Sequence, residues 1–331
     1  MRRLTAALAT ATVAALALAG CSTASDAPAG SAPAGAAEEG AFPVSIDTLF
    51  GEVAIDEEPT RIVALGWGDA ETVLALGGQP VGASDWLGFG GDGVGPWAEG
   101  LYDESPVIIE TLEPDYEAIA ALEPDLILDV KGSGDEARHD RLSEIATTLG
   151  VPEGGESYLT TPEQQLEMIS AALGVPERGA EIAAELDDAF TAAADAHPEW
   201  DGLTATAATR TSEGWGAYID GTERVEFLER LGFVLNPAID AIEPSDGGFS
   251  VDVSQEELDT FDADLIIAFP IFIESTEITD DPQWQAIPAV EAGHAVVIDG
   301  DVSSAYSLGS PLSQQYAIDE VTALIADALG S

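Results

Sequence analysis

Two stretches that lie far apart in this chain carry the same pattern, and this repeat constrains the fold more than any other feature. The stretch YEAIAALEPDLILDV (116–130) resembles QEELDTFDADLIIAF (255–269). The aligned pairs are Glu117 with Glu256, Asp125 with Asp264, Leu126 with Leu265 and Ile127 with Ile266. The repeat predicts two related lobes.

Within the first half, short apolar runs alternate with helical patterns. RIVALG (61–66) and PVGAS (80–84) are typical of buried strands, and GDAETVLALGG (68–78) between them indicates a helix that stops at glycine. EARHDRLSEIATTLG (136–150) is expected to form a further helix. This alternation predicts the α/β class with parallel strands in each lobe.

One long helical pattern separates the two halves. In PERGAEIAAELDDAFTAAADAH (176–197), Ile182, Leu186, Phe190 and Ala194 recur at four-residue spacing. A helix of this length spans about 33 Å, which is enough to join two lobes. A capping box with Thr161 as N-cap is expected to start the helix before it.

We therefore expect an N-terminal lobe over residues 45–175, a bridging helix over 176–198 and a C-terminal lobe over 199–331. In open α/β sheets, ligands bind beyond the carboxyl ends of the strands. Two facing lobes therefore predict a ligand cleft between them.

The N-terminus has the pattern of a secretory signal. Residues 1–20 have a basic start, an apolar run too short to span a bilayer, and small residues before Cys21, the only cysteine. The Leu-Ala-Gly-Cys end resembles the bacterial lipobox, which implies that Cys21 is lipidated. The alternative is a plain secretory signal followed by a stray thiol. Residues 21–44 are expected to form a flexible tether.

The charge balance excludes some partners. The chain has 62 acidic and 10 basic residues, for a formal net charge of −52. Nucleic-acid binding requires basic patches, so we expect no nucleic-acid partner. The same charge disfavours direct contact with anionic lipid, so the lipid anchor is expected to provide the membrane attachment. We interpret the acidity as an adaptation to salty or alkaline surroundings.

Five motifs in this order resemble the helical-backbone substrate-binding proteins of ABC importers, and most of all their ferric-siderophore branch, to which the cobalamin binders are close. These motifs are RIVALG (61–66), EPDYEAIAALEPDLIL (113–128), VSQEELDTFDADLII (253–267), DPQWQAIPAVEAGHAVVID (281–299) and GSPLSQQYAIDEVTALIADAL (309–329). The resemblance implies two Rossmann-like lobes and a monomeric bacterial lipoprotein on the extracytoplasmic face of the cell membrane. It also implies that the protein delivers an Fe(III)-siderophore to an ABC permease and its ATPase.

No catalytic motif is present in the sequence. The three histidines, His139, His197 and His294, are scattered, and neither GxSxG nor a P-loop occurs. We therefore expect a protein that is not an enzyme, has no cofactor, and binds iron that arrives already chelated instead of binding the metal directly.

Candidate ligand contacts lie in loops after the predicted strands, and each loop is rich in glycine or holds an aromatic residue that we expect to be exposed. They are Trp67, Trp86, Lys131, Arg210, Trp215, Tyr218, Phe249, Phe272 and Tyr306. Large rings between lobes suit a bulky, partly apolar ligand, and the cations suit chelate oxygens.

Each of these candidates has a plainer alternative. The aromatic candidates could pack in a core or between helices, with Phe272 continuing a buried strand, and Arg210 could pair with one of the many acids. Asp69 is expected to act as an N-cap. Tyr306 could ligate iron, as tyrosines do in part of the family.

For Glu117 and Glu256, the glutamates that the repeat aligns, we predict a role other than ligand contact. The resemblance implies that one glutamate on each lobe contacts arginines of the permease. The local alternative is that both favour the dipole of a first helical turn, with Ser254 and Glu257 forming a capping box.

Three function hypotheses follow from these observations. The first is a ferric-siderophore receptor, and the second is a cobalamin or haem receptor of the same fold. The third is a lipid-anchored structural or adhesion protein without a small ligand. Because Lys131, Arg138, Arg210 and Arg224 are the few cations placed to offset the acidic body, we expect a neutral or cationic ferric hydroxamate to bind better than a tris-catecholate.

We predict that Cys21→Ala releases or mislocalises the protein and leaves the folded domain intact, because a lipidated cysteine would be its membrane attachment. Cell fractionation with a radiolabelled fatty acid measures this, with Cys21→Ser as a second variant. Label on either variant, or full membrane retention, would contradict the prediction.

Overall fold

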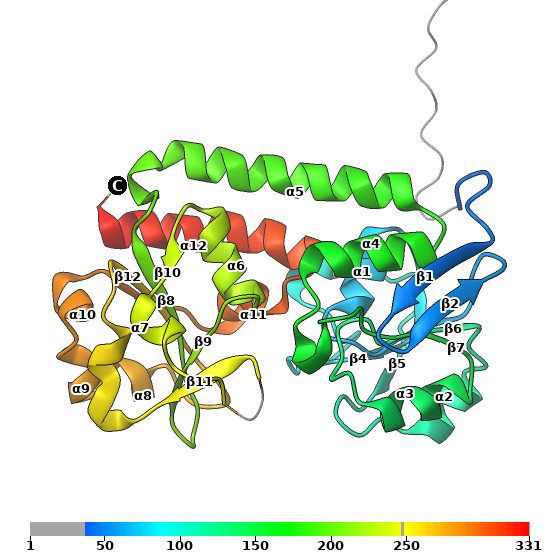
Figure 1. Ribbon diagram of the computed structural model, residues 1–331, viewed down its shortest axis with the longest axis horizontal. Coiled ribbons are helices and arrows are strands. Elements are labelled where there is room, and N and C mark those ends of the chain that lie inside the picture. Colours follow the sequence, from blue (N-terminus) through cyan, green and yellow to red (C-terminus); the bar gives the residue numbers. More distant parts are fainter. Residues whose placement is uncertain (1–36, 246–247, 331) are drawn as a thin grey trace, which may run out of the picture. The chain divides into compact units, whose positions relative to one another are not determined.

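The computed structural model describes residues 37–245 and 248–330. The predicted signal peptide, Cys21 and the first part of the predicted tether lie outside the described residues. Two β-sheets, each packed against helices, form two lobes (Figure 1). In the described part of the chain, none of the helices combines the length and the apolar character needed to cross a membrane.

The N-terminal lobe contains a parallel five-stranded sheet in the order β5-β4-β3-β6-β7. Its strands are β3 (Ile62–Ala64), β4 (Pro80–Ser84), β5 (Val107–Ile109), β6 (Leu126–Leu128) and β7 (Thr147–Leu149). Alternate residues enter different cores: Leu126 and Leu128 pack on one face, and Ile127 packs on the other. Burial on both faces explains why these strands are continuous apolar runs.

Helices cover both faces of this sheet. They are α1 (Asp69–Ala75), α2 (Tyr116–Ala121), α3 (Glu136–Ser143) and α4 (Pro162–Ala172). An antiparallel hairpin of β1 (Val44–Thr48) and β2 (Gly51–Ile55) adds Ile46 and Ile55 to the core, and η1 (Pro96–Ala98) and η2 (Glu156–Tyr158) lie in connecting loops.

The prediction of a helix over residues 136–150 is wrong in its second half. Helix α3 ends at Ser143, and β7 begins at Thr147. The β-branched pair Thr147 and Thr148 pairs with β6, which extends the sheet. The predicted capping box of α4 is confirmed, because Thr161 and Gln164 bond reciprocally.

The C-terminal lobe contains a six-stranded sheet in the order β11-β9-β8-β12-β13, with β10 also paired to β8. The strands are β8 (Thr204–Arg210), β9 (Trp215–Tyr218), β10 (Val234–Leu235), β11 (Ser250–Val253), β12 (Leu265–Pro270) and β13 (Ala295–Val297). Here the expectation of parallel strands holds only in part, because β9 is antiparallel to both β8 and β11. The turn from Thr211 to Gly214 is too short for a crossover, so β9 returns beside β8.

Helices pack on both faces of this second sheet (Figure 1). They are α6 (Glu223–Arg230), α7 (Pro237–Asp240), η4 (Gln255–Phe261), α8 (Thr276–Thr279), α9 (Pro282–Gln285), α10 (Pro288–Ala292) and α11 (Gly300–Leu308), with η3 (Pro198–Trp200) ahead of the sheet.

Helix α5 (Pro176–Ala196) joins the lobes as the sequence predicts. Ile182 and Leu186 pack in the core of the N-terminal lobe, and Phe190, one turn further on, packs in that of the C-terminal lobe. A second helix, α12 (Pro311–Leu329), packs along α5 and also contacts α1 (Figure 1). The lobes are therefore joined by two helices, where the sequence predicts one.

The sequence repeat corresponds to a repeated contact. The carboxylate of Asp125 accepts hydrogen bonds from the backbone N–H and the hydroxyl of Thr60 at the start of β3. Asp264 accepts the same two bonds from Thr204 at the start of β8. This equivalence and the position of α5 support our proposal of an N-terminal lobe over residues 45–175, a bridging helix over 176–198 and a C-terminal lobe over 199–331.

Candidate functional site

Each sheet brings two loops together where its strand order reverses. In the N-terminal lobe the reversal lies between β3 and β6, and the N–H of Trp67 after β3 donates to the carbonyl of Lys131 after β6 at 2.9 Å. In the C-terminal lobe it lies between β8 and β12, which end side by side at Arg210 and Pro270. Ligands of open α/β sheets bind at such reversals, so these four loops form the candidate ligand site.

Asp69 holds the two N-terminal loops in place. Its buried carboxylate accepts hydrogen bonds from the N–H groups of Gly66 and Val130, each at 3.0 Å, and from the Gln165 side chain at 2.6 Å. A Cβ at Gly66 would lie 2.3 Å from this carboxylate, so the position requires glycine. The prediction that Asp69 is an N-cap is wrong, because Gly68 occupies that position and Asp69 begins the helix.

Three aromatic side chains of the N-terminal lobe gather at these loops. The ring centroids of Trp67 and Trp86 lie 5.7 Å apart, and those of Trp86 and Tyr158 lie 5.5 Å apart. The indole N–H of Trp67 donates to the Leu308 carbonyl at 2.9 Å, across the lobes, and that of Trp86 donates to Leu65. With their N–H groups bonded to backbone, these half-buried rings offer apolar faces.

Arg224, in α6, joins these rings to aromatic side chains of the C-terminal lobe. Its guanidinium carbon lies 4.2 Å from the ring centroid of Tyr218, 5.8 Å from that of Phe269 and 5.5 Å from that of Trp67. Tyr218 and Phe269 are buried in the core of the C-terminal lobe, and the partly buried Phe249 packs against it, with its ring centroid 6.4 Å from that of Tyr218. The Nε of Arg224 is buried and has no hydrogen-bond partner among the residues that the structure describes. A donor that lacks a partner among apolar rings suits an oxygen-rich ligand.

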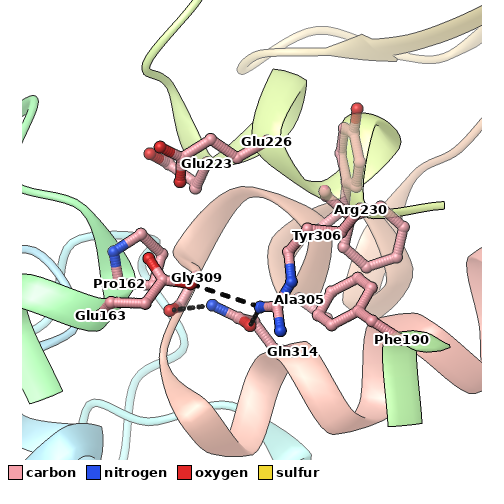
Figure 2. Close-up of a pocket in the computed structure, with 11 residues that line it drawn as sticks. Pro162, Glu163, Phe190, Glu223, Glu226, Arg230, Ala305, Tyr306, Gly309 and Gln314 are labelled. Atoms are coloured by element: carbon pink, nitrogen blue, oxygen red, sulfur yellow. Dashed lines mark hydrogen bonds and ion pairs between the residues drawn. The ribbon is translucent and has the colours of Figure 1, made fainter. Parts of the chain in front are cut away.

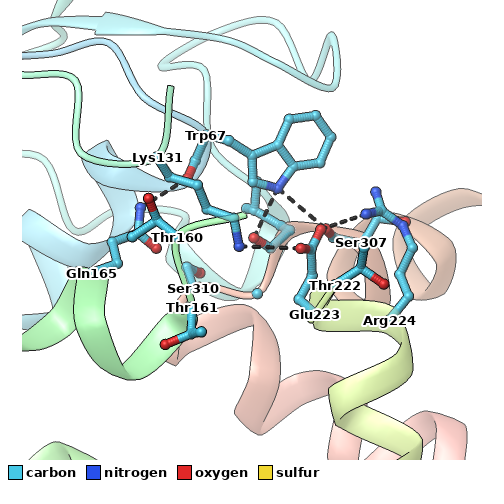
Figure 3. Close-up of polar contacts among 12 residues, drawn as sticks. Trp67, Lys131, Thr160, Thr161, Gln165, Thr222, Glu223, Arg224, Ser307 and Ser310 are labelled. Carbon is cyan, nitrogen blue, oxygen red and sulfur yellow. Dashed lines mark hydrogen bonds and ion pairs between the residues drawn. The ribbon is translucent and has the colours of Figure 1, made fainter. Parts of the chain in front are cut away.

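Arg224 also belongs to a buried ion cluster that spans the lobes. Lys131 Nζ lies 3.1 Å from one carboxylate oxygen of Glu223, and Arg224 Nη1 contacts the other (Figure 3). Lys131, a predicted ligand contact, is only 1% exposed. It can therefore influence a ligand through its charge more than through direct contact.

Two further predicted contacts lie in hydrophobic cores, which the sequence does not reveal. The Trp215 ring is buried and stacks on Trp284 with centroids 5.5 Å apart, and its N–H donates to Gln255. Tyr306 is buried and its hydroxyl donates to the Arg224 carbonyl at 2.6 Å. Neither side chain is exposed to a ligand. Iron ligation by Tyr306 would break the hydrogen bond that its hydroxyl donates to the Arg224 carbonyl.

The last two predicted contacts, Arg210 and Phe272, are not buried in a core. Arg210 is partly buried, with its guanidinium carbon 5.5 Å from the Trp215 ring centroid and an Nε that lacks a hydrogen-bond partner in residues 37–245 and 248–330. Within these residues it lies over a ring and forms no ion pair with an acid. Phe272 is 95% exposed and has a φ of 56°, which is unusual for a bulky residue. The core alternative for Phe272 is thus wrong.

The structure adds two residues that the sequence reasoning missed. From the sequence, Arg224 is named only among the cations that offset the acidic body, and Tyr158 is not a candidate. The sequence gives only a weak indication that Arg224 belongs to the site: it is one of ten basic residues and lies at the start of a helix after the Gly-Thr turn. Tyr158 follows a loop with positive φ at Ser157 and Tyr158, which no sequence pattern announces.

The two glutamates of the repeat, Glu117 and Glu256, are exposed and lie in the first turns of α2 and η4. The expected capping box at Ser254 is absent, because its hydroxyl donates to the Glu257 carboxylate and caps no backbone N–H. On the other lobe, the Asp115 side chain caps the start of α2.

A pocket of about 300 Å³, part of it open to solvent, lies between α4 and α5 on one side and α6 and α12 on the other. Arg230 crosses it, paired with Glu163 and bonded to Gln314, and Phe190 and Tyr306 form its apolar wall (Figure 2). Because its cation is already paired, we interpret it as part of the joint between the lobes. The described residues contain no group of three or more His, Cys, Asp or Glu side chains that could hold a metal ion.

Comparison with known protein families gives a match over most of the chain. The model of a family described as periplasmic binding protein matches residues 62–302. A probable siderophore-binding lipoprotein of Bacillus subtilis (strain 168), YfiY, is 26% identical over 282 residues, which cover 81% of this chain and 82% of YfiY.

Solved structures share the fold. The iron uptake ABC transporter substrate-binding protein PiaA of Streptococcus pneumoniae TIGR4, in complex with ferrichrome, is 25% identical with a TM-score of 0.74, covering 87% of this chain and 99% of PiaA. A periplasmic solute binding protein of Mycobacterium smegmatis is also 25% identical, with a TM-score of 0.76 and the same coverage. The predicted fold class, an α/β protein of two lobes joined by a long helix, is confirmed.

Burial raises the pKa of Asp69 to about 6, although its hydrogen bonds oppose the rise. Because the folded pKa lies above the ordinary value of 3.8 for an aspartate, the stability linked to this carboxyl is fully present below about pH 3.8 and is lost as pH rises to about 6. We predict that the difference in unfolding free energy between wild type and Asp69→Asn shrinks by about 2 to 3 kcal/mol from pH 4 to pH 7. Denaturant unfolding at several pH values measures this, and a constant difference over that range contradicts it.

Proposed function

Because this chain belongs to the periplasmic binding protein family, we propose that it is an extracytoplasmic lipoprotein that captures a ferric siderophore and delivers it to an ABC importer. In this proposal it binds and releases its ligand unchanged, and the partners are the permease and its ATPase. The names of YfiY and of PiaA with ferrichrome support the siderophore as the ligand class.

The observation that carries the proposal is the position of Arg224 among rings from both lobes. A ferric siderophore presents chelating oxygens, with partial negative charge, within an apolar framework. Apolar ring faces of Trp67, Trp86 and Tyr158 can pack on the framework, and the Nε of Arg224, which has no hydrogen-bond partner among the described residues, can donate to an oxygen. A pocket for a free metal ion would need a different set of side chains, namely several converging carboxylates or imidazoles.

We expect a neutral ferric trihydroxamate to bind wild-type protein and to quench its tryptophan fluorescence. Arg224→Leu should weaken this binding by about 10- to 100-fold, since it removes a charged donor worth about 1.5 to 3 kcal/mol. Arg141→Leu is the matched control, because it removes the same charge from an exposed site over Tyr116 in the other lobe.

The same titration separates the alternatives. A ferric tricatecholate, cobalamin and haemin are tested beside the trihydroxamate, and we expect each to bind more weakly. Tight binding of cobalamin or haemin alone would favour the second receptor hypothesis, and binding of no compound in the panel would favour a structural protein. Equal losses in Arg224→Leu and Arg141→Leu would remove Arg224 from the site.

We further propose that Glu117 and Glu256 contact the permease. Each follows a strand whose carboxyl end faces the same edge as the ligand loops: β5 is parallel to its neighbours, and β11 runs in the direction of β8 because both are antiparallel to β9. The two glutamates thus lie on equivalent, exposed sites of that edge, one on each lobe.

We predict that Glu117→Ala and Glu256→Ala each lower iron uptake by cells at least severalfold and leave the quenching titration unchanged, because neither side chain belongs to the ring cluster. Glu144→Ala and Glu291→Ala remove exposed acids from the same two lobes and serve as controls with normal uptake. Loss of chelate affinity in step with loss of uptake would refute a docking role.

A further inference from the structure

The buried ion cluster between the lobes has an unequal charge balance. Lys131 comes from the loop after β6 in the N-terminal lobe, and Glu223 and Arg224 open α6 in the C-terminal lobe. Each of the three is at most 8% exposed. Glu223 lies between the two cations and contacts both (Figure 3). Two positive charges and one negative charge therefore occupy the joint beside the aromatic rings.

Glu223 is held in its ionised form. Burial acts to raise the pKa of its carboxyl, but the nearby charges of Lys131 and Arg224 outweigh burial and lower the pKa. Its position in the first turn of α6 favours a negative charge as well. At neutral pH the three side chains together therefore carry one net positive charge.

We propose that Glu223 determines which ligand charge the site accepts, by neutralising one of the two buried cations beside the aromatic rings. This inference rests on the proposed function. It assigns to this chain ferric chelates that are neutral or carry a single negative charge, and it makes Glu223 a specificity-determining residue that acts through Lys131 and Arg224.

The magnitude follows from the environment of the cluster. In a protein medium with an effective dielectric constant of about 20, a unit charge roughly 12 Å from a ligand charge changes binding by about tenfold. Arg224 reaches the ring cluster, 5.5 Å from the Trp67 centroid, so a ligand held there lies within this range of Glu223. Surface acids act through water and salt and have weaker effects. A single buried carboxylate can thus outweigh many exposed ones.

The test compares two variants that differ only in the charge of Glu223. Lys131→Met leaves Glu223 paired with Arg224, for a cluster charge of zero, and Lys131→Met/Glu223→Gln restores the wild-type charge without leaving a buried lysine unpaired. The probes are a linear ferric trihydroxamate with a free, cationic terminal amine and the same chelate with that amine succinylated and anionic. The measured quantity is the ratio of their dissociation constants.

We expect Lys131→Met to shift the ratio about 100-fold toward the cationic chelate, because the two chelates carry opposite charges and each responds by about tenfold, and the double variant to return it to within about twofold of wild type. Glu229→Gln, which removes an exposed acid from the same helix, should leave the ratio unchanged. Thermal unfolding by circular dichroism verifies that each variant is folded.

Two results would overturn the inference, and they are distinguishable. If Glu223 only ties the lobes together, both chelates weaken alike and the ratio is the same in every variant, which overturns this inference alone. If neither chelate binds the wild-type protein, the proposed function falls, and this inference falls with it.

Discussion

Helix α5 packs into both hydrophobic cores, and the relation between the two lobes depends on this shared packing. Ile182 and Leu186 pack in one core and Phe190 in the other, all from one apolar stripe. A helix cannot bend between adjacent turns without losing backbone hydrogen bonds, so the two cores are coupled along its length. Helix α12 packs along the same stretch and adds a second rigid connection. The loops at the strand ends therefore meet across a joint whose geometry is largely set before any ligand arrives.

Basic residues are scarce in this chain, and several of them stabilise this joint. Arg230 contacts Asp187 of α5 and Glu163 of α4, and Lys131 contacts Glu223 of the other lobe. In a chain with 62 acidic residues, partners for a cation are plentiful, so the pairs that form are chosen by burial and geometry. Lys131 and Glu223 are buried, so their charges attract each other more strongly than those of Arg230 and its exposed partners do, although removal from water offsets part of this gain.

The same scarcity bears on recognition. Arg224 is buried among rings from both lobes, and one of its donors has no partner in the described part of the chain. A strongly acidic body repels anions at long range, but within the site the local charge decides the outcome. The proposed ligand contacts and the proposed docking glutamates both lie at the edge where the parallel strands end. Ligand capture and delivery to a permease would thus involve the same edge of both sheets.

The sequence determined the elements that depend on local pattern. The spacing of apolar residues predicted α5 and the parallel N-terminal sheet, and the capping-box motif at Thr161 predicted the start of α4. The repeat that aligns Asp125 with Asp264 predicted two related lobes. Where a short turn altered the strand direction, as between β8 and β9, the local pattern could not show it.

Only the tertiary structure decided which candidate side chains face the site. Trp67 and Trp215 are both flanked by glycine in the sequence, yet one joins the rings between the lobes and the other stacks on Trp284 in a core. Lys131 and Glu223 are 92 positions apart, and nothing near either residue predicts their contact. Strand and helix formation follow from the spacing of neighbouring residues, whereas burial and ion pairing depend on which distant segments pack together.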